Sequence, residues 1–316
     1  MGYKLAGYDV VGNCEIDKEM QRVYLANNHP KFSFNMDIRD FRRLPNEQIP
    51  GELFGIDILD GSPPCSVFSM AGKREDGWGK EKVFREGQKK QTLDDLFFEF
   101  IELANRLKPK VVIAENVKGL ICGNAKGYVK EICAKFKGAG YEVQAFVLNA
   151  ALMGVPQSRE RVFFVARRRD CGYPKIILKF SSRPIPFGLV REKRGNENMT
   201  ERERLLMKSR RSGDKTVADI MARLKGNVSG FGSILVDDHR VCPTITSSGS
   251  AFRQCDGLKM TTLDMCHVQT FPENYDFLGM DAKYICGMSV PPVMMAAISN
   301  EIAKQLFGVA EDEYES

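Results

Sequence analysis

Long apolar runs are missing from this 316-residue sequence, and no stretch approaches the ~20 residues that a membrane-spanning helix requires. The first nine residues also lack the apolar core of a secretion signal. Hydrophobic residues make up 43% and charged residues 28% of the chain, a balance typical of soluble globular proteins. We therefore expect a cytoplasmic protein with no membrane association.

Paired metal-binding residues are missing as well. The nine cysteines include no C-x-x-C pair, and the chain has only three histidines. An odd, scattered set of cysteines in a chain of this size indicates reduced thiols in a reducing compartment. The sequence therefore argues against a disulfide framework and a structural zinc site, and we expect no bound metal.

Charge of one sign is in slight excess, with a formal net charge of +5. The positive residues are concentrated, because three arginines stand together at residues 167–169 and residues 192–211 are dense in Arg, Lys and Glu. Such runs form an ordinary solvated surface about as often as they contact a polyanion. The charge therefore permits a nucleic-acid partner without requiring one.

Strand and helix signals alternate through the first half of the chain. Stretches with helical spacing of apolar residues separate short apolar runs, and this alternation is typical of βαβ units. The predicted strands are residues 8–14, 54–59, 111–114, 143–148 and 161–166, and the predicted helices are residues 18–28, 92–107 and 128–136. We expect an α/β fold with a doubly wound, mostly parallel, Rossmann-like sheet that binds ligands at the carboxyl ends of its strands.

The alternation stops after residue 170. The next 88 residues or so are rich in Arg, Lys, Gly, Ser and Pro, with weak strand signals and one helical stretch near residues 217–224. Helical spacing returns at residues 290–306. The sequence thus predicts a catalytic and cofactor-binding domain at residues 1–170, a smaller irregular domain at residues 171–258, and a segment at residues 259–316 that returns to the first domain.

Three short motifs carry candidate chemistry. Cys65 follows a predicted strand and two prolines, which is a poor core position and a good one for an exposed nucleophile. Glu115 directly follows the predicted strand at residues 111–114, and burial at its base favours the protonated acid. Arg159 and Arg161 stand at alternate positions on the way into another strand, so we expect them to point the same way.

These motifs, together with their order, carry a resemblance to a known family. Pro63-Pro64-Cys65, Glu115-Asn116-Val117 and Gln157-x-Arg159-x-Arg161 follow one another as in the cytosine-5 DNA methyltransferases. The sequence resembles that family over nearly its whole length, except in residues 170–240. The resemblance implies a DNA (cytosine-5-)-methyltransferase that transfers a methyl group from S-adenosylmethionine to a flipped-out cytosine.

The resemblance assigns roles to the catalytic residues. Cys65 would add as a thiolate to carbon 6 of cytosine, which makes carbon 5 nucleophilic enough to accept a methyl group. Glu115 in its neutral form would donate to ring nitrogen 3 and hold the amino group. Arg161, with Arg159, would bind the base carbonyl and the neighbouring phosphate.

The resemblance assigns binding residues too. The implied cofactor-binding residues are Glu15 and Ile16 at the ribose, Asp37 at the adenine, Pro63, and Ser289 in the last family motif. The implied DNA-binding residues are Ser69, Lys73, Arg74 and Gln157. Residues 71–91, which are rich in glycine and cations, would form the loop that closes over the flipped base.

The sequence departs from the family pattern in several places. The first family motif, a strand that ends in F-x-G-x-G-G, is missing, which predicts an absent central strand and a weakened site for the methionine end of the cofactor. A start assigned at an internal methionine, a truncated chain and a pseudoenzyme would each account for this. Met288 stands where the family usually has Asn, and Lys259, Asp264 and His267 stand where it favours Arg, Glu and Arg.

Several functions remain open at this point. The first is the modification enzyme of a restriction–modification pair, acting as a monomer on double-stranded DNA, with the cognate endonuclease acting separately. A tRNA cytosine-5 methyltransferase and a non-catalytic DNA-binding relative are alternatives, and a Rossmann-type enzyme with another cofactor is more distant. The irregular basic domain favours DNA, because reading a duplex needs a dedicated recognition domain. The complete set Cys65, Glu115, Arg159 and Arg161 argues for catalysis.

Overall fold

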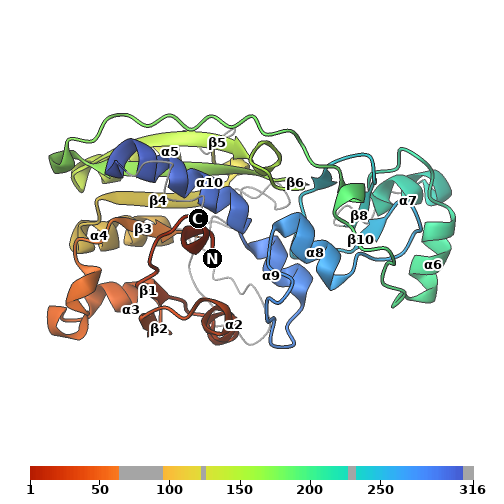
Figure 1. Ribbon diagram of the computed structural model, residues 1–316, viewed down its shortest axis with the longest axis horizontal. Helices are drawn as coiled ribbons and strands as arrows, with labels where there is room; N and C mark the ends of the chain where they lie inside the picture. Colours follow the sequence, from red (N-terminus) through yellow and green to blue (C-terminus); the bar gives the residue numbers. More distant parts are fainter. Residues whose placement is uncertain (64–94, 122–125, 227–232, 309–316) are drawn as a thin grey trace. The chain divides into compact units, whose positions relative to one another are not determined.

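The computed structural model describes residues 1–63, 95–121, 126–226 and 233–308 (Figure 1). The chain forms two compact units, each assembled from separate segments. Unit 1 comprises Met1–Tyr8, Asn149–Arg159 and Lys179–Glu301, and unit 2 comprises Asp9–Leu148, Glu160–Leu178 and Ile302–Ser316. Most described residues of the expected irregular domain belong to unit 1, and the boundaries at residues 170 and 258 stay predictions.

Unit 2 is built on a four-stranded sheet. The strand order is β3 (Ile58–Gly61), β4 (Val111–Val117), β7 (Glu160–Arg168) and β5 (Tyr141–Asn149). β3 and β4 are parallel, whereas β4 and β7 are antiparallel. The α/β prediction is therefore confirmed with a mixed sheet. The chain between β5 and β7 contains no crossover helix. A parallel connection between these two strands would need one, so this connection is not of the βαβ type.

Two shorter strands form a separate parallel ladder in unit 2. β1 (Gly12–Cys14) pairs with β2 (Phe32–Phe34), and among the described residues no ladder joins β1 to β3. The helices of this unit are α2 (Lys18–Asn28), α3 (Ile38–Arg43), α4 (Leu96–Leu107) and α5 (Lys126–Gly138). The bounds of α2 match the predicted helix, because Asp17 caps it by accepting hydrogen bonds from two backbone N–H groups of its first turn.

The core of unit 2 follows from the alternation of side chains along β4 and β7. Val112 and Ala114, with the facing residues of β7, pack against Phe97, Phe100 and Ile101 of α4. The residues in between, such as Ile113 and Val165, are also fully buried. Both faces of the central strands are therefore covered, as a doubly wound fold requires.

Unit 1 contains short strands and several helices. The strand pairs are β6 (Gln157–Ser158) with β9 (Cys242–Pro243), and β8 (Ile234–Val236) with β10 (Ala251–Arg253), both parallel. The helices are α1 (Gly2–Leu5), α6 (Glu201–Lys208), α7 (Val217–Lys225), α8 (Thr262–Gln269), α9 (Ala282–Met288) and α10 (Pro292–Ile302). A turn of π-helix, Ala303–Phe307, continues α10 into unit 2. No helix in the described part of the chain is long and apolar enough to cross a membrane.

Gly61, the last residue of β3, is packed against α4. An added Cβ at this position would lie 2.5 Å from Cε2 of Phe100, a ring that is only 3% exposed. We expect Gly61→Ala to lower the free energy of unfolding by about 1–3 kcal/mol, because a buried ring has little room to move. Gly51→Ala is the matched control, since nothing lies within 4 Å of its added Cβ. Equal urea midpoints for the two variants would contradict the expectation.

Candidate active site

Glu115 and Arg161 are brought together by the ladder between β4 and β7. Arg161 is opposite Val117 in the register, so Glu115, two residues earlier on β4, lies on the same face. Glu115 Oε1 and Arg161 Nε are 2.9 Å apart, and the two side chains are 12% and 14% exposed. Burial lowers the pKa of the Arg161 guanidinium, and the Glu115 carboxylate opposes that shift. In this arrangement Glu115 accepts from an arginine, whereas its predicted role requires it to carry a proton, so that role stays a prediction.

Asn116 ties the end of β4 to Pro63, two residues after β3. Its Nδ2 donates to the carbonyl oxygen of Pro63 at 2.9 Å, and its Oδ1 accepts from the Val117 N–H at 2.9 Å. The side chain is only 4% exposed. This residue therefore fixes Pro63 to the strand that carries Glu115. Sequence reasoning assigned it no role, although it stands inside the Glu-Asn-Val motif.

Several predicted site residues fall outside the described residues. Cys65, the predicted nucleophile, is one of them. The predicted DNA contacts Ser69, Lys73 and Arg74, and the loop at residues 71–91, lie in the same stretch. The structure describes the chain up to Pro63, whose carbonyl group bonds to Asn116. The roles of these residues stay predictions.

Arg159 belongs to unit 1 and has different partners from Arg161. It stands between β6 and β7, so the alternation of a strand does not run through it. Its Nη1 donates to the carbonyl of Ile245 at 3.1 Å and its Nη2 to the carbonyl of Gly287 at 2.9 Å. The residue is 2% exposed. In this geometry the guanidinium holds two backbone segments of unit 1, and a contact with the base or a phosphate stays a prediction.

Gln157 is fully buried in unit 1. Its Nε2 donates to Oε1 of Gln269 at 2.7 Å, and its Oε1 accepts from the Ile245 N–H at 3.1 Å. Gln269 in turn donates to the carbonyl of Ser289 at 2.8 Å, while the Ser289 hydroxyl donates to the carbonyl of Ile285. Gln157 could reach DNA only after a rearrangement, and the cofactor contact predicted for Ser289 stays a prediction.

The predicted cofactor residues of unit 2 lie at the carboxyl ends of β1 and β2. The Glu15 N–H donates to the carbonyl of Phe34 at 3.0 Å, which continues the ladder, and Asp37 caps α3 by accepting from the Arg39 N–H at 2.8 Å. Burial raises the pKa of Glu15. Burial, with the nearby charges of Glu15 and Asp37, raises the pKa of the Cys14 thiol to about 12. The two carboxylates therefore share one neighbourhood at the end of the ladder.

This donor set suits the adenosine end of a nucleotide-like ligand. Ribose hydroxyls and an adenine amino group need hydrogen-bond acceptors, and a carboxylate offers about four lone-pair sites. Glu15 uses one oxygen on the Asp17 N–H at 2.8 Å, and Ile16 follows it in the loop that Asn35 holds through the carbonyls of Glu15 and Ile16. Among the described residues no group of histidine, cysteine and carboxylate side chains could hold a metal ion.

Comparison with known proteins identifies the family of this chain. The sequence profile of the C-5 cytosine-specific DNA methylases matches residues 1–304. The chain belongs to this family. The methylase is 27% identical to the type II methyltransferase M.NgoPII of Neisseria gonorrhoeae, with 97% of this chain and 92% of that protein covered. It is 30% identical to M.NgoFVII of the same species, with 82% and 71% covered.

Solved structures support the fold of the methylase. A protein assigned as a DNA modification methyltransferase, encoded within an Escherichia coli prophage, superimposes with a TM-score of 0.72 at 17% identity, covering 97% of this chain and 95% of that one. A variant of Spodoptera frugiperda DNMT2 gives a TM-score of 0.65 at 18% identity, with the same coverage. At these identities the likeness concerns the fold alone, and it confirms the predicted α/β methyltransferase architecture.

Asn116 gives a test of how the site is assembled. We expect Asn116→Asp to reduce methyl transfer strongly and to cost about 1–3 kcal/mol of stability, because an acceptor would then face the Pro63 carbonyl in a buried place. The control is Asn105→Asp, since the Asn105 side chain accepts from Lys108 and an aspartate would still do so. Urea unfolding and a methylation assay measure both effects. Full activity of Asn116→Asp would show that the turn does not depend on this bond.

Proposed function

We propose that this methylase acts on double-stranded DNA as the modification enzyme of a restriction–modification system, with S-adenosylmethionine as methyl donor. The observation that carries the proposal is the joint placement of the Glu115–Arg161 pair and the Asn116–Pro63 bond at the ends of β3 and β4. M.NgoPII and M.NgoFVII, which resemble this chain, are named type II methyltransferases. The cognate endonuclease would act separately, and the methylase would act as a monomer.

The chemistry explains why these residue types are needed. Carbon 5 of cytosine is a poor nucleophile, and addition of the Cys65 thiolate to carbon 6 makes it a reactive one. Glu115 would hold ring nitrogen 3 and the amino group, and Arg161 would bind the base carbonyl while keeping Glu115 in place. After transfer the proton leaves carbon 5, the bond between sulfur and carbon 6 breaks, and the thiolate is restored.

The cofactor supplies a methyl group on a positively charged sulfur. Glu15 and Ile16 would bind its ribose, Asp37 its adenine, and Pro63 and Ser289 would complete the site. The position of Glu15, Ile16 and Asp37 just beyond the carboxyl ends of β1 and β2 supports the first three assignments. The assignments to Pro63 and Ser289 rest on the family motifs alone.

DNA would be read by residues 171–258. α6 in this region presents the exposed side chains of Arg202, Arg204 and Lys208, which suit a phosphate backbone. Ser69, Lys73 and Arg74 would contribute further contacts near the target base, and Gln157 would do so only after leaving its buried partners Gln269 and Ile245. A target base inside a duplex is out of reach of any nucleophile, so the enzyme would act on a flipped-out cytosine.

Glu15 gives a pH test of the cofactor site. Its pKa is raised by burial, so its carboxylate is lost at a higher pH than that of an ordinary glutamate. The carboxylate accepts from ribose hydroxyls more strongly than the neutral acid does. Affinity for S-adenosylmethionine should therefore fall as pH drops through this raised pKa. Glu15→Gln should bind about tenfold more weakly at pH 8, with a flat profile. Calorimetry from pH 8 to pH 5 measures this, with Glu19→Gln on the exposed face of α2 as control. Matching profiles for the wild type and Glu15→Gln would remove Glu15 from the site.

Cys65 gives the test of the reaction itself. We expect Cys65→Ser to abolish methyl transfer while DNA affinity stays within about threefold, because the thiolate acts in the chemistry and contributes little to binding. The wild type should form a covalent complex with a duplex that contains 5-fluorocytosine, since the fluorine cannot leave as the proton does. Cys65→Ser should form none. Cys133→Ser is the matched control, and trapping by Cys65→Ser would identify another nucleophile.

A further inference from the structure

Three uncharged side chains join α2 to the β1–β2 ladder in unit 2. Asn13 of β1 and Ser33 of β2 are direct partners in the parallel register. Gln21 of α2 contacts both, because its Oε1 accepts from Nδ2 of Asn13 at 2.8 Å and its Nε2 donates to Oγ of Ser33. Gln21 is only 5% exposed. These side chains, which we call the Gln21 bridge, therefore link one helix to both strands, and the proposed mechanism uses none of them.

The ladder between β1 and β2 is short. Each strand contributes three residues, whereas strands in globular proteins usually have about five or six. Among the described residues no third strand pairs with either of them. A buried amide is satisfied only where an acceptor and a donor both lie within reach, which here requires one arrangement of the helix and the two strands. The Gln21 bridge therefore helps to fix α2 on the ladder.

The first turn of α2 connects the Gln21 bridge to the Glu15 carboxylate. The Gln21 N–H donates to the carbonyl of Asp17 at 2.8 Å, and Asp17 is the capping residue of this helix. The Asp17 N–H in turn donates to Oε1 of Glu15 at 2.8 Å. The position of α2 therefore determines where this N–H points, and with it the orientation of the Glu15 carboxylate.

The second carboxylate of the proposed cofactor site follows β2. Asp37 lies four residues after Ser33 and caps α3. Asn35, between them, crosses to the loop after β1, where its Nδ2 donates to the carbonyl of Glu15 at 2.8 Å. Glu15 and Asp37 therefore follow the two strands that the Gln21 bridge joins, so a change in the spacing of these strands would change the distance between the two carboxylates.

We propose that Gln21 is a positioning residue of the cofactor site, which holds Glu15 and Asp37 at the spacing that the adenosine end of S-adenosylmethionine requires. It would act through the first turn of α2 and through the pairing of β1 with β2. Because Gln21 is buried beneath the helix that carries it, its effect on the cofactor is indirect. The inference rests on the proposed function, in which Glu15 binds the ribose and Asp37 the adenine.

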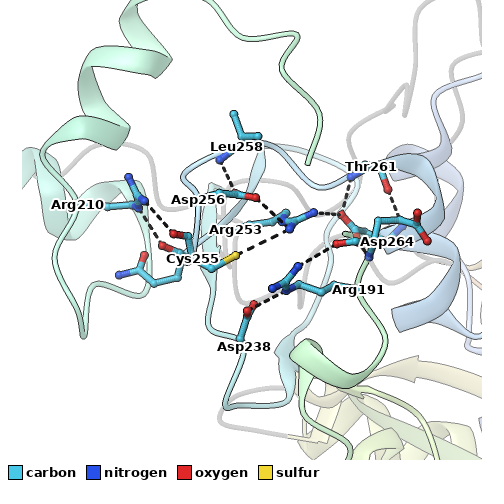
Figure 2. Close-up of polar contacts among 11 residues, drawn as sticks. Arg191, Arg210, Asp238, Arg253, Cys255, Asp256, Leu258, Thr261 and Asp264 are labelled. Carbon is cyan, nitrogen blue, oxygen red and sulfur yellow. Dashed lines mark hydrogen bonds and ion pairs between the residues drawn. The ribbon is translucent and has the colours of Figure 1, made fainter. Parts of the chain in front are cut away.

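The Gln21 bridge carries no charge, which makes its substitution easy to interpret. The polar network of unit 1 is different, because Figure 2 shows the guanidinium of Arg253 between the carboxylates of Asp256 and Asp264. Removing a charge from such a network would change the electrostatic field as well as the positions of its members. An uncharged replacement of Gln21 leaves the net charge of unit 2 unchanged, so a change in cofactor affinity would report on position.

The test measures the affinity for S-adenosylmethionine by calorimetry at pH 8 and the melting temperature without ligand. Gln21→Met, Ser33→Ala and the two combined are each made in the wild-type chain and in Glu15→Gln. Methionine is about as long as glutamine and has no N–H donor, whereas Ser33→Ala removes a single hydroxyl from an exposed residue. Asn27→Met is the matched control, because Nδ2 of Asn27 donates to the carbonyl of Val23 within α2.

We expect Gln21→Met to weaken cofactor binding about tenfold and Ser33→Ala about threefold. The combined variant should lose no more than Gln21→Met alone, because both changes break one bridge. In Glu15→Gln the same Gln21→Met change should cost only about threefold, since the carboxylate that it positions is gone. In a methylation assay Gln21→Met should raise KM for the cofactor and keep kcat within about twofold. Asn27→Met should keep wild-type affinity even where its melting temperature falls.

Two results would overturn the inference. One is a folded Gln21→Met with the cofactor affinity of Asn27→Met. The other is an equal loss of affinity with and without the Glu15 carboxylate, which would make the Gln21 bridge a general support of the fold and nothing more. If Gln21→Met fails to fold, Ser33→Ala decides by the same comparison between the two backgrounds. A wild-type enzyme that binds no S-adenosylmethionine would refute the proposed function first, and the inference would fall with it.

Discussion

The antiparallel ladder between β4 and β7 is the interaction on which the candidate site depends. Its central residues, Val112 to Ala114 on β4 and Val162 to Ala166 on β7, are fully buried. Because the strands run in opposite directions, the beginning of β7 meets the end of β4. Arg161 therefore lies beside Glu115. In a parallel arrangement with the start of β7 beside the start of β4, Arg161 would face Val112. Glu115 would then lie three residues further along, about 10 Å away at the usual rise per residue.

The sequence could predict the helices and strands but not that β7 runs antiparallel to β4. Side chains alternate along a strand in the same way whether it runs parallel or antiparallel, so periodicity predicts the strand at residues 161–166 and leaves its direction open. Local signals predicted more: α2 occupies the residues expected from its spacing and its capping aspartate. α4 spans Leu96–Leu107, and residues 92–94 of the predicted helix lie outside the described residues. The motifs predicted that a glutamate and an arginine share one site, and the direction of the β4–β7 ladder determines how their side chains contact each other.

Buried polar side chains were the hardest features to predict. Gln157 and Arg159 look like surface residues from their type, and we assigned them to DNA and to the target base. Their partners, Gln269, Ile245 and Gly287, lie more than 80 residues away in the chain. Only folding brings such partners together, so no local sequence pattern predicts them. Asn116 illustrates the same point, since its bond to Pro63 spans 53 residues.

In unit 1 these buried polar groups help to fix how the elements are arranged, a role that a more extensive apolar core has in larger proteins. Its strands have two or three residues each, too short to fix a register by a long ladder. Apolar clusters alone would hold such short elements together without selecting one arrangement. Directional groups supply the selection: an amide pair at Gln157 and Gln269, a buried guanidinium at Arg159, and a charge pair at Arg253 and Asp264. Each costs desolvation, so each is stable only in the arrangement that brings its partners within reach. In the proposed function unit 1 presents side chains to a duplex at defined positions. Directional groups would serve that role, because register errors leave buried charges unpaired.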